Sequence, residues 1–341
     1  MKIVYIFRER RDIPPSIENV FNNLGHLLSE KGNQITYFTL PNKNRLLQII
    51  YVLKFYFKHN KEIDIFHVTG DVHWVSLLLP KSKTLLTIHD FGAYDNNSFP
   101  NNWFLKKIYK VFWFDLPISC LRKIHLISNT MFLRGGYYFP KLQEKGIVIY
   151  NTIIPFTKNE KIINSPNFKI LQVGTDRHKN LELLIESAIK LKNIINIELN
   201  IIGLISQNLK DKLDQNNLKY NSYFNITKEE LNEVYNKSDI LFFASIHEGF
   251  GLPIIEAQTL GLPVITSNIE ICKEIGGDAA IYIDNTSSQD GVDAILRLYR
   301  DETFFMEQIE KGYNNVKRFE SENIREQFEI LYKKIIDEKN K

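Results

Sequence analysis

Two glutamates on either side of a glycine-bearing turn are the residues of this chain best suited to chemistry. Glu248 and Glu256 bracket the segment 249–252, which follows the apolar run Ile240–Ala244. This pattern predicts a strand, a tight loop and a helix that opens at Pro253. The backbone amides of such a helix N-terminus attract phosphate, whereas the two carboxylates can accept hydrogen bonds from sugar hydroxyls. The segment therefore suggests a site for a sugar phosphate or a nucleotide sugar.

The same run of residues closely resembles the donor-site signature of retaining glycosyltransferases of family GT4, which have the GT-B fold. The resemblance implies that Glu256 holds the ribose hydroxyls of the nucleotide, that Glu248 contacts the transferred sugar, and that the amides between them hold sugar and phosphate. An ordinary strand–loop–helix unit with two solvated acids is the alternative, which the joint pattern disfavours. The matching residues are Glu248, Gly249, Phe250, Gly251, Leu252, Pro253, Glu256, Ala257, Gly261 and Pro263.

A second segment, Gly174 to Asn180, ends a predicted strand and opens a helix. Gly174 permits a sharp turn, and Arg177 and Lys179 place two cations near the N-terminus of that helix. The segment resembles the Val-Gly…Lys-Asn stretch of the family, which implies that Lys179 and Arg177 neutralise the leaving diphosphate of the donor. Thr175 occupies the position where many members have arginine, and Arg177 is expected to substitute for it. The alternative is a solvated basic loop.

Histidine follows two of the predicted strands in the first half of the chain. Thr87-Ile-His89-Asp90 ends an apolar strand, where open α/β sheets place their ligands. A lone histidine is more often structural, but a subgroup of GT4 enzymes carries the same segment, which implies that His89 hydrogen-bonds or orients the donor sugar. His73 and Trp74 lie in a similar loop and are acceptor-side candidates, although an aromatic residue in this context is more often part of the packing.

Charge is distributed unevenly between the two halves. Residues 1–157 contain 20 Lys and Arg against 11 Asp and Glu, whereas the remainder contains 23 against 29. The first half is therefore expected to face something anionic, either a membrane surface or a phosphorylated acceptor. Arg10 and Arg11 stand where the family has a glycine-rich loop, and we expect them to contact an anionic acceptor. No helix-turn-helix, zinc or RNP-like pattern indicates nucleic-acid binding.

Two basic segments with aromatic residues, Leu46–Phe57 and Asn102–Phe114, suit either a membrane interface or core packing. The chain of 341 residues is 44% hydrophobic with a mean hydropathy of −0.22, which is ordinary for a globular protein. Cys120 and Cys272 match no metal or redox spacing. The N-terminal apolar run is too short for a signal peptide, and no run is long enough to span a membrane. We therefore expect a cytoplasmic protein, with peripheral contact on the inner face of an anionic membrane as an option.

Strand-like runs alternate with helix-length segments along the whole chain, which predicts an α/β protein with doubly wound parallel sheets. The resemblance implies two Rossmann-like domains that face each other across a cleft: an acceptor-side domain at residues 1–155, a donor-binding domain at 156–320, and a helix at 321–341 that crosses back to the first domain. The predicted strands are Lys2–Phe7, Gln34–Leu40, Ile65–Val68, Thr84–Ile88, Lys123–Ser128, Gly146–Tyr150, Lys169–Val173, Ile197–Ile202, Ile240–Ala244, Val264–Thr266 and Ala280–Ile283.

The resemblance implies a retaining glycosyltransferase that moves a hexose from GDP-mannose or a UDP-sugar to a glycan or lipid-linked saccharide, in the synthesis of a cell-surface polysaccharide or O-antigen. The segment Gly277–Ala280, together with the segment around His89, favours the mannosyltransferase-like subgroup. No cofactor and no essential metal are expected, because GT-B enzymes use side chains and helix termini. The alternatives are a non-catalytic nucleotide-sugar-binding subunit that supports a partner transferase and a non-hydrolysing sugar-nucleotide epimerase, which the Glu-Gly-Phe-Gly signature disfavours.

Overall fold

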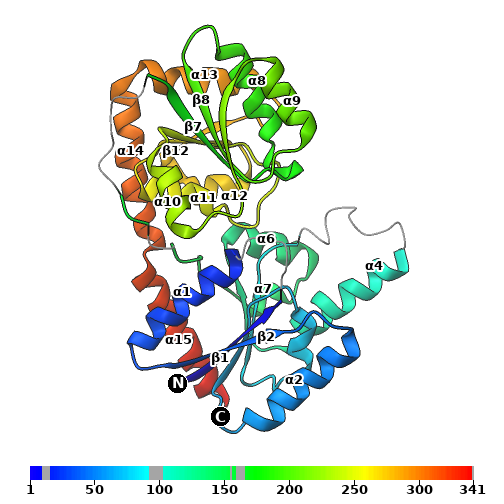
Figure 1. The fold of residues 1–341 in the computed structure, drawn as a ribbon. Helices are drawn as coiled ribbons and strands as arrows, with labels where there is room; N and C mark the ends of the chain where they lie inside the picture. The colour runs from blue at the N-terminus through cyan, green and yellow to red at the C-terminus, as the bar shows by residue number, and fades with distance from the viewer. Residues whose placement is uncertain (10–15, 92–102, 154–155, 159–165, 340–341) are drawn as a thin grey trace. The chain divides into compact units, whose positions relative to one another are not determined.

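The computed structural model describes the chain except for residues 10–15, 92–102, 154–155, 159–165 and 340–341 (Figure 1). The chain divides into two compact units. Unit 1 comprises Met1–Ile154 together with Phe319–Lys341, and unit 2 comprises Pro155–Arg318. Among the described residues, no helix combines the length and the apolar character needed to cross a membrane.

Unit 1 is built around a parallel sheet with the strand order β2-β1-β3-β4-β5-β6. Its strands are β1 (Lys2–Arg8), β2 (Gln34–Leu40), β3 (Ile65–Val68), β4 (Thr84–Ile88), β5 (Ile124–Leu126) and β6 (Gly146–Val148). Its helices are α1 (Ser16–Glu30), α2 (Arg45–His59), η1 (His73–Leu78), α4 (Trp103–Lys110), η2 (Val111–Asp115), α5 (Leu116–Cys120), α6 (Asn129–Tyr138), α7 (Leu142–Lys145) and α15 (Ser321–Lys339).

Unit 2 has a parallel sheet with the order β12-β11-β10-β7-β8-β9. Its strands are β7 (Phe168–Val173), β8 (Ile197–Ile202), β9 (Lys219–Tyr223), β10 (Ile240–Phe243), β11 (Val264–Ser267) and β12 (Ala280–Ile283). Its helices are η3 (Arg177–Lys179), α8 (Leu181–Leu191), α9 (Gln207–Gln215), α10 (Lys228–Asn236), α11 (Leu252–Thr259), α12 (Glu270–Gly276), η4 (Gly277–Ala279), α13 (Ser288–Arg300) and α14 (Glu302–Val316), and η5 (Lys317–Phe319) joins the two units.

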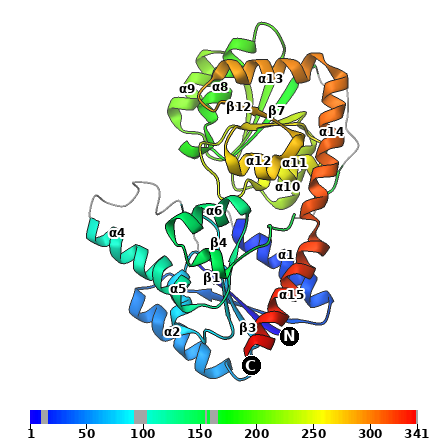
Figure 2. The same ribbon diagram turned by 180° about the vertical axis from the view of Figure 1, so that it is seen from behind.

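The C-terminal helix α15 packs against the first unit of the chain rather than the second. It lies beside α1 in both views (Figures 1 and 2), and its apolar face buries Ile324, Phe328, Leu331 and Tyr332. Phe319 is already part of unit 1, where its buried ring lies 5.2 Å from that of Tyr150. The return to unit 1 therefore begins two residues before the predicted start at position 321.

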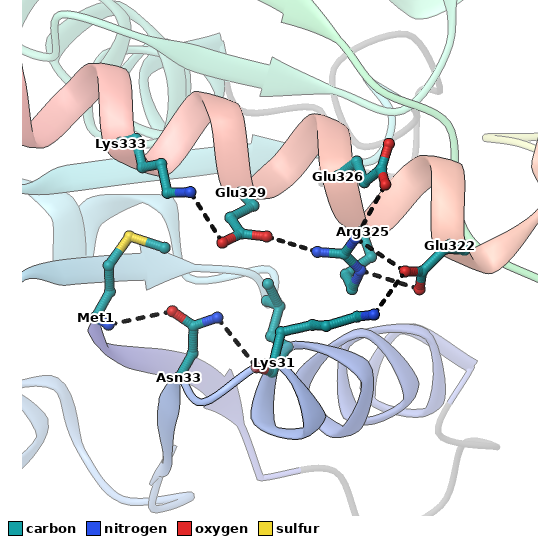
Figure 3. A network of polar contacts seen from close by, with 9 residues as sticks. Met1, Lys31, Asn33, Glu322, Arg325, Glu326, Glu329 and Lys333 are labelled. Atoms are coloured by element: carbon teal, nitrogen blue, oxygen red, sulfur yellow. Dashed lines mark hydrogen bonds and ion pairs between the residues drawn. The ribbon is translucent and has the colours of Figure 1, made fainter.

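A network of charges fixes the start of α15 (Figure 3). The buried guanidinium of Arg325 forms ion pairs with three glutamates of its own helix, and Glu322 also reaches Lys31, just past the end of α1, at 3.2 Å. Because the Arg325 side chain is only 5% exposed, its pairs are less screened by solvent than surface pairs are. The network therefore links the end of α1 to the first turns of α15.

A continuous chain of buried hydrogen bonds ties α15 to the sheet of unit 1. The imidazole of His125 donates through Nε2 to the carbonyl of Ile149 at 2.8 Å, and its Nδ1 lies 2.8 Å from Thr87 Oγ1. Thr87 in turn meets His67 Nε2 at 2.7 Å, and His67 Nδ1 meets the Tyr332 hydroxyl at 2.8 Å. Burial lowers the pKa of His67, and it lowers the pKa of His125 to about 3, so both rings are neutral near pH 7.

The Ile149 carbonyl sets the direction of this chain, because it can only accept. His125 therefore carries its proton on Nε2, so Thr87 donates to His125 Nδ1 and accepts from His67 Nε2. His67 Nδ1 is left as an acceptor for the Tyr332 hydroxyl, which also lies 3.2 Å from the hydroxyl of Tyr5. Each group between Ile149 and Tyr332 has one defined role, so a single arrangement of protons satisfies the whole chain of hydrogen bonds.

The sequence prediction missed one strand, β9. Its residues, Lys219–Tyr223, are exposed or half-buried and include two charged or amide side chains, so they form no apolar run. The strand lies at the edge of the sheet, where it pairs only with β8. Because β9 lies at the edge of the sheet, its residues need not be apolar. The hydrophobic pattern of the sequence therefore does not predict this strand.

Candidate functional site

The strand order of unit 2 reverses at β7, whose neighbours are β8 on one side and β10 on the other. In open α/β sheets, ligands bind outside the carboxyl ends of the strands at such a switch point. Here those ends carry η3 after β7 and the loop Ala244–Gly251 after β10. Both segments that were selected from the sequence therefore meet at the switch point of unit 2.

Lys179 and Glu248 form an ion pair across this point. Lys179 Nζ lies 2.6 Å from Glu248 Oε1, and the two side chains are 18% and 9% exposed. The ammonium also lies 4.9 Å from the ring centroid of Phe243, the last residue of β10. Gly174 has a φ of 89°, and a Cβ there would come within 2.8 Å of the Lys179 side chain. Glycine at 174 therefore provides both the turn and the space for the lysine stem.

Side-chain amides hold the backbone around Lys179 in place. Asn180 adopts a left-handed conformation (φ 57°) and donates through Nδ2 to the carbonyls of Ala244 at 3.1 Å and Asn285 at 2.8 Å. Gln172, which is buried in β7, donates to the carbonyls of Gly174 at 3.2 Å and Lys179 at 3.0 Å. These four bonds preorganise the lysine before any ligand arrives.

The helix α11 follows the glutamate loop and begins at Leu252, so Pro253 is its second residue. Its N-cap, Gly251, has a φ of 97°, and no side chain caps this end of the helix. At the other end Gly261 has a φ of 73°, and the amides of Gly261 and Leu262 donate back to the helix carbonyls of Gln258 and Ala257. The C-terminus is thus closed by a Schellman motif, whereas the N-terminal amides are left for an anion.

Glu256 lies on α11 and is only 7% exposed. The Tyr235 hydroxyl, from α10, donates to Glu256 Oε2 at 2.6 Å. Burial raises the pKa of Glu256, while the Tyr235 bond and the positive charge of Lys179 act in the opposite direction. Because the Tyr235 hydroxyl binds Oε2 of Glu256, the other carboxylate oxygen, Oε1, can accept hydrogen bonds from the hydroxyl groups of a ligand.

The remaining predicted donor residues occupy the edge of this site. Phe250 is buried and anchors the glutamate loop, whose Gly249 is half-buried. Arg177 is exposed on η3. Thr175, at the position where the family has arginine, donates to the carbonyl of Leu204 at 2.8 Å and packs against Gly203. Thr175 is therefore part of the local packing, and Arg177 is the exposed cation of this loop.

The candidates in unit 1 follow β3 and β4. His89 donates through Nε2 to the carbonyl of Thr69 at 2.7 Å, and burial lowers its pKa to about 4. The imidazole is therefore neutral near pH 7, with the lone pair on Nδ1, and can accept a hydrogen bond. His73 donates through Nδ1 to the carbonyl of Trp113 at 2.9 Å and is buried.

Trp74 is buried, and the guanidinium of Arg45 lies 5.3 Å from the centroid of its ring. Its ring is thus part of the packing, as aromatic residues in such loops usually are. Arg10 and Arg11 lie outside the described residues. The part of the chain that the structure describes contains no group of three or more His, Cys, Asp and Glu that could hold a metal ion.

Sequence reasoning missed three residues that shape the site: Tyr235, Gln172 and Asn180. Tyr235 lies 21 positions before Glu256 on another helix, so no local pattern joins them. Gln172 is a polar residue that directly follows the apolar residues Ile170 and Leu171 in β7, and this polar position was the available signal. Asn180 belongs to the segment Gly174–Asn180, but its hydrogen bonds to the carbonyls of Ala244 and Asn285 join distant parts of the chain and leave no local signal.

Comparison with known proteins agrees with this geometry. Residues 154–315 match the family model "Glycosyl transferases group 1". The chain is 23% identical to the O-antigen biosynthesis glycosyltransferase WclY of Escherichia coli, over 99% of both chains. It is 26% identical to the O-antigen chain mannosyltransferase RfbU of Salmonella typhimurium, over 74% of this chain and 69% of that protein.

The fold also matches a solved structure. HepE of Anabaena, in complex with UDP, superimposes with a TM-score of 0.78 at 14% identity and covers 98% of this chain and 100% of its own. The two parallel six-stranded sheets with their helices are those of the GT-B fold, as expected from the sequence. Over residues 154–315 the chain matches group 1 glycosyltransferases, and the proteins to which it is similar include an O-antigen chain mannosyltransferase.

Proposed function

We propose that this transferase moves a hexose from a nucleotide sugar to a glycan or lipid-linked saccharide, with retention at the anomeric carbon. The observation that carries the proposal is the Lys179–Glu248 pair at the switch point of unit 2, followed by the buried Glu256 on helix α11. One cation and two carboxylates next to an uncapped helix N-terminus provide complementary partners for a diphosphate and for hydroxyl groups.

Each group has a role that follows from its surroundings. Glu256, held by Tyr235, accepts hydrogen bonds from the ribose hydroxyls, and Glu248 accepts them from the hexose. Lys179 and the first amides of α11 bind the diphosphate, and the exposed Arg177 adds a second cation. In unit 1, Nδ1 of the neutral His89 accepts a hydrogen bond from a hydroxyl of the sugar.

The proposed reaction breaks the bond between the anomeric carbon and the phosphate oxygen of the donor. The acceptor hydroxyl oxygen bonds to the same face of that carbon, and its proton passes to the departing diphosphate. Negative charge grows on the diphosphate as the bond breaks, so preorganised cations and amides stabilise the transition state more than the ground state. In this proposal no cofactor or essential metal takes part.

For the donor and pathway, we propose GDP-mannose and the assembly of an O-antigen or a similar surface polysaccharide. The names of RfbU, an O-antigen chain mannosyltransferase, and WclY, an O-antigen biosynthesis glycosyltransferase, support this choice. UDP-sugars are the competing donors, because HepE has been solved with UDP. A glycan or lipid-linked saccharide is the acceptor that such a pathway supplies.

The donor can be tested by thermal shift with GDP-mannose and with UDP- and dTDP-sugars. We expect GDP-mannose to raise the melting temperature most, and Glu256→Gln to weaken nucleotide binding about tenfold or more, because hydrogen bonds to charged groups are strong. Glu248→Gln should instead lower turnover more than nucleotide affinity. If no nucleotide sugar shifts the melting temperature, the proposed site is wrong.

A second candidate, a non-catalytic subunit that binds nucleotide sugars, is favoured only by Thr175 and the altered loop at Arg8–Ser16. It predicts a thermal shift with a donor but no release of nucleoside diphosphate when saccharide acceptors are added. Release of the diphosphate, with an unchanged anomeric configuration in the product by NMR, would exclude it. An inverted product would exclude the retaining mechanism.

A further inference from the structure

Helix α2 of unit 1 exposes large apolar side chains along the face that points away from its packing side. Leu46 is 68% exposed and Phe57 is 73% exposed, and Leu47, Ile50 and Tyr51 between them are exposed as well. The side of the helix that packs into the unit contributes only Gln48 and Val52 as buried residues. An amphipathic helix of a water-facing protein normally has the opposite arrangement, with its apolar residues inside.

A second exposed apolar row runs through α4, η2 and α5. Ile108, Phe112 and Leu116 recur at every fourth position, which keeps them on one side of a helix, and all three are exposed. The segment η2 lies near the start of α2, because the guanidinium of Arg45 lies 4.8 Å from the centroid of the Trp113 ring in η2. Both helices also lie on the same side of unit 1 in the two views (Figures 1 and 2).

We call these side chains the apolar surface of unit 1. It consists of Leu46, Leu47, Ile50, Tyr51, Phe57, Ile108, Phe112 and Leu116.

The charges in and beside the apolar surface are mainly positive, and Asp115, directly before Leu116, is the exception. No Asp or Glu occurs between Glu30 and Glu62, or between Asp95 and Asp115. Lys54 and Lys58 lie on the exposed side of α2, and Lys107 is exposed on α4. Apolar side chains with lysines beside them complement a surface that has an apolar interior and anionic groups on its outside.

We propose that the apolar surface docks unit 1 on an anionic phospholipid bilayer. Its apolar side chains enter the boundary between headgroups and acyl chains, while the lysines reach the lipid phosphates. A protein partner fits less well, because the cores of protein interfaces are depleted of lysine. Docking needs neither donor nor acceptor and is therefore independent of the proposed reaction. A lipid-linked acceptor would, however, lie in the same bilayer.

The test is co-sedimentation of the full chain, without substrates, with vesicles of phosphatidylcholine alone or with about a third phosphatidylglycerol. We expect binding to the anionic vesicles only, weakened by salt because the surface charges are screened. Each lysine near an anionic surface changes partitioning about fivefold, so Lys54→Glu/Lys58→Glu should reduce it about 25-fold or more.

Variants that replace apolar side chains by serine distinguish insertion into the bilayer from electrostatic attraction to it. Leu46→Ser/Phe57→Ser on α2 and Phe112→Ser on η2 should each reduce binding about tenfold, because they remove the inserted side chains. The matched control is Ile194→Ser/Leu204→Ser, two exposed apolar residues of unit 2, which should bind like the unchanged protein. Unchanged circular dichroism and an unchanged thermal shift with the donor would show that the fold and the nucleotide site remain intact.

Three outcomes would overturn the proposal. The first is absence of binding to anionic vesicles, and the second is binding that the α2 and η2 variants leave unchanged. The third is a dimer by light scattering that becomes a monomer in these variants, since a second copy would then be the occupant of the surface. None of these outcomes bears on donor binding, so the proposed function is judged separately.

Discussion

At the scale of single residues, the site of unit 2 consists of buried charges that depend on one another. Glu248 is 9% exposed and its partner Lys179 is 18% exposed, so neither charge is well solvated without the other. Glu256 relies on one hydroxyl, that of Tyr235, and on the more distant charge of Lys179. Changes to any of these groups should therefore affect stability as well as binding.

Removing one partner of the Lys179–Glu248 ion pair should lower the free energy of unfolding more than removing both partners. Lys179→Met leaves Glu248 buried without its counter-ion, which should lower the free energy of unfolding by about 3–5 kcal/mol. Lys179→Met/Glu248→Gln should regain much of this loss but remain inactive. Urea denaturation measures both effects, with exposed Lys190→Met as the control. If the single and double variants were equally stable, the pair would not be a coupled unit.

The raised pKa of Glu256 predicts a specific dependence of stability on pH. In the unfolded chain this carboxyl ionises near its ordinary value of 4.5, whereas in the folded protein it ionises at higher pH. The folded state binds more protons in that interval, so the stability contributed by Glu256 is present below pH 4.5 and is lost as pH rises through the folded pKa. Glu256→Gln removes this dependence.

We therefore expect Glu256→Gln to gain stability relative to the unchanged protein as the pH is raised from about 4 to 7. Urea denaturation across this range provides the measurement, and Glu307→Gln, which alters an exposed glutamate of the same unit, is the control. A stability difference that stays constant over the range would show that Glu256 ionises normally in the folded protein.

At the scale of elements, α15 is attached to the sheet of unit 1 by buried hydrogen bonds. Its position depends on Tyr332, whose hydroxyl satisfies the buried Nδ1 of His67. Because that nitrogen can only accept in the hydrogen-bond chain that ends at Ile149, no alternative proton arrangement can replace the tyrosine.

Tyr332→Phe should therefore leave an unsatisfied buried acceptor and destabilise the protein by about 1–3 kcal/mol. Chemical denaturation monitored by the aromatic residues of unit 1 would measure this loss. The control is Tyr137→Phe, which alters the hydroxyl of an exposed tyrosine in α6. Equal stability of the two variants would mean that the hydrogen-bond chain contributes nothing to the attachment of α15.

At the scale of the whole molecule, unit 2 is continuous in sequence, whereas unit 1 is assembled from two distant parts. Phe319 and the apolar face of α15 (Ile324, Phe328, Leu331) complete the core of unit 1. At about 1.5–3 kcal/mol for each buried side chain, their burial contributes an amount comparable to the total stability of an ordinary domain.

A chain truncated after Arg318 should consequently retain a folded unit 2 and lose the folded unit 1. Limited proteolysis should then leave a stable fragment that starts near Pro155, and nucleotide-sugar binding by that fragment should persist in part. A truncated protein that resists proteolysis throughout would show that α15 is dispensable for unit 1.

The sequence was sufficient to predict the helices and strands whose apolar residues follow a clear pattern, and also to predict the motif that opens with Glu248. The apolar runs of β1, β3, β4 and β10 predicted buried parallel strands, and Gly261 ended α11 as expected. The polar edge strand β9 had no such run. Contacts between distant segments, such as Tyr235 with Glu256, depend on the packing of whole helices and leave no local signal.

The discontinuity of unit 1 has a consequence for its synthesis. A ribosome releases the six strands of that unit long before it releases Phe319 and α15, and unit 2 emerges in between. Until Phe319 and α15 have been synthesised, the sheet of unit 1 lacks part of its core and His67 is not covered by α15. Unit 2 can already fold during this time. The unit whose synthesis begins first is thus completed only after unit 2 has been synthesised, because its core needs Phe319 and α15.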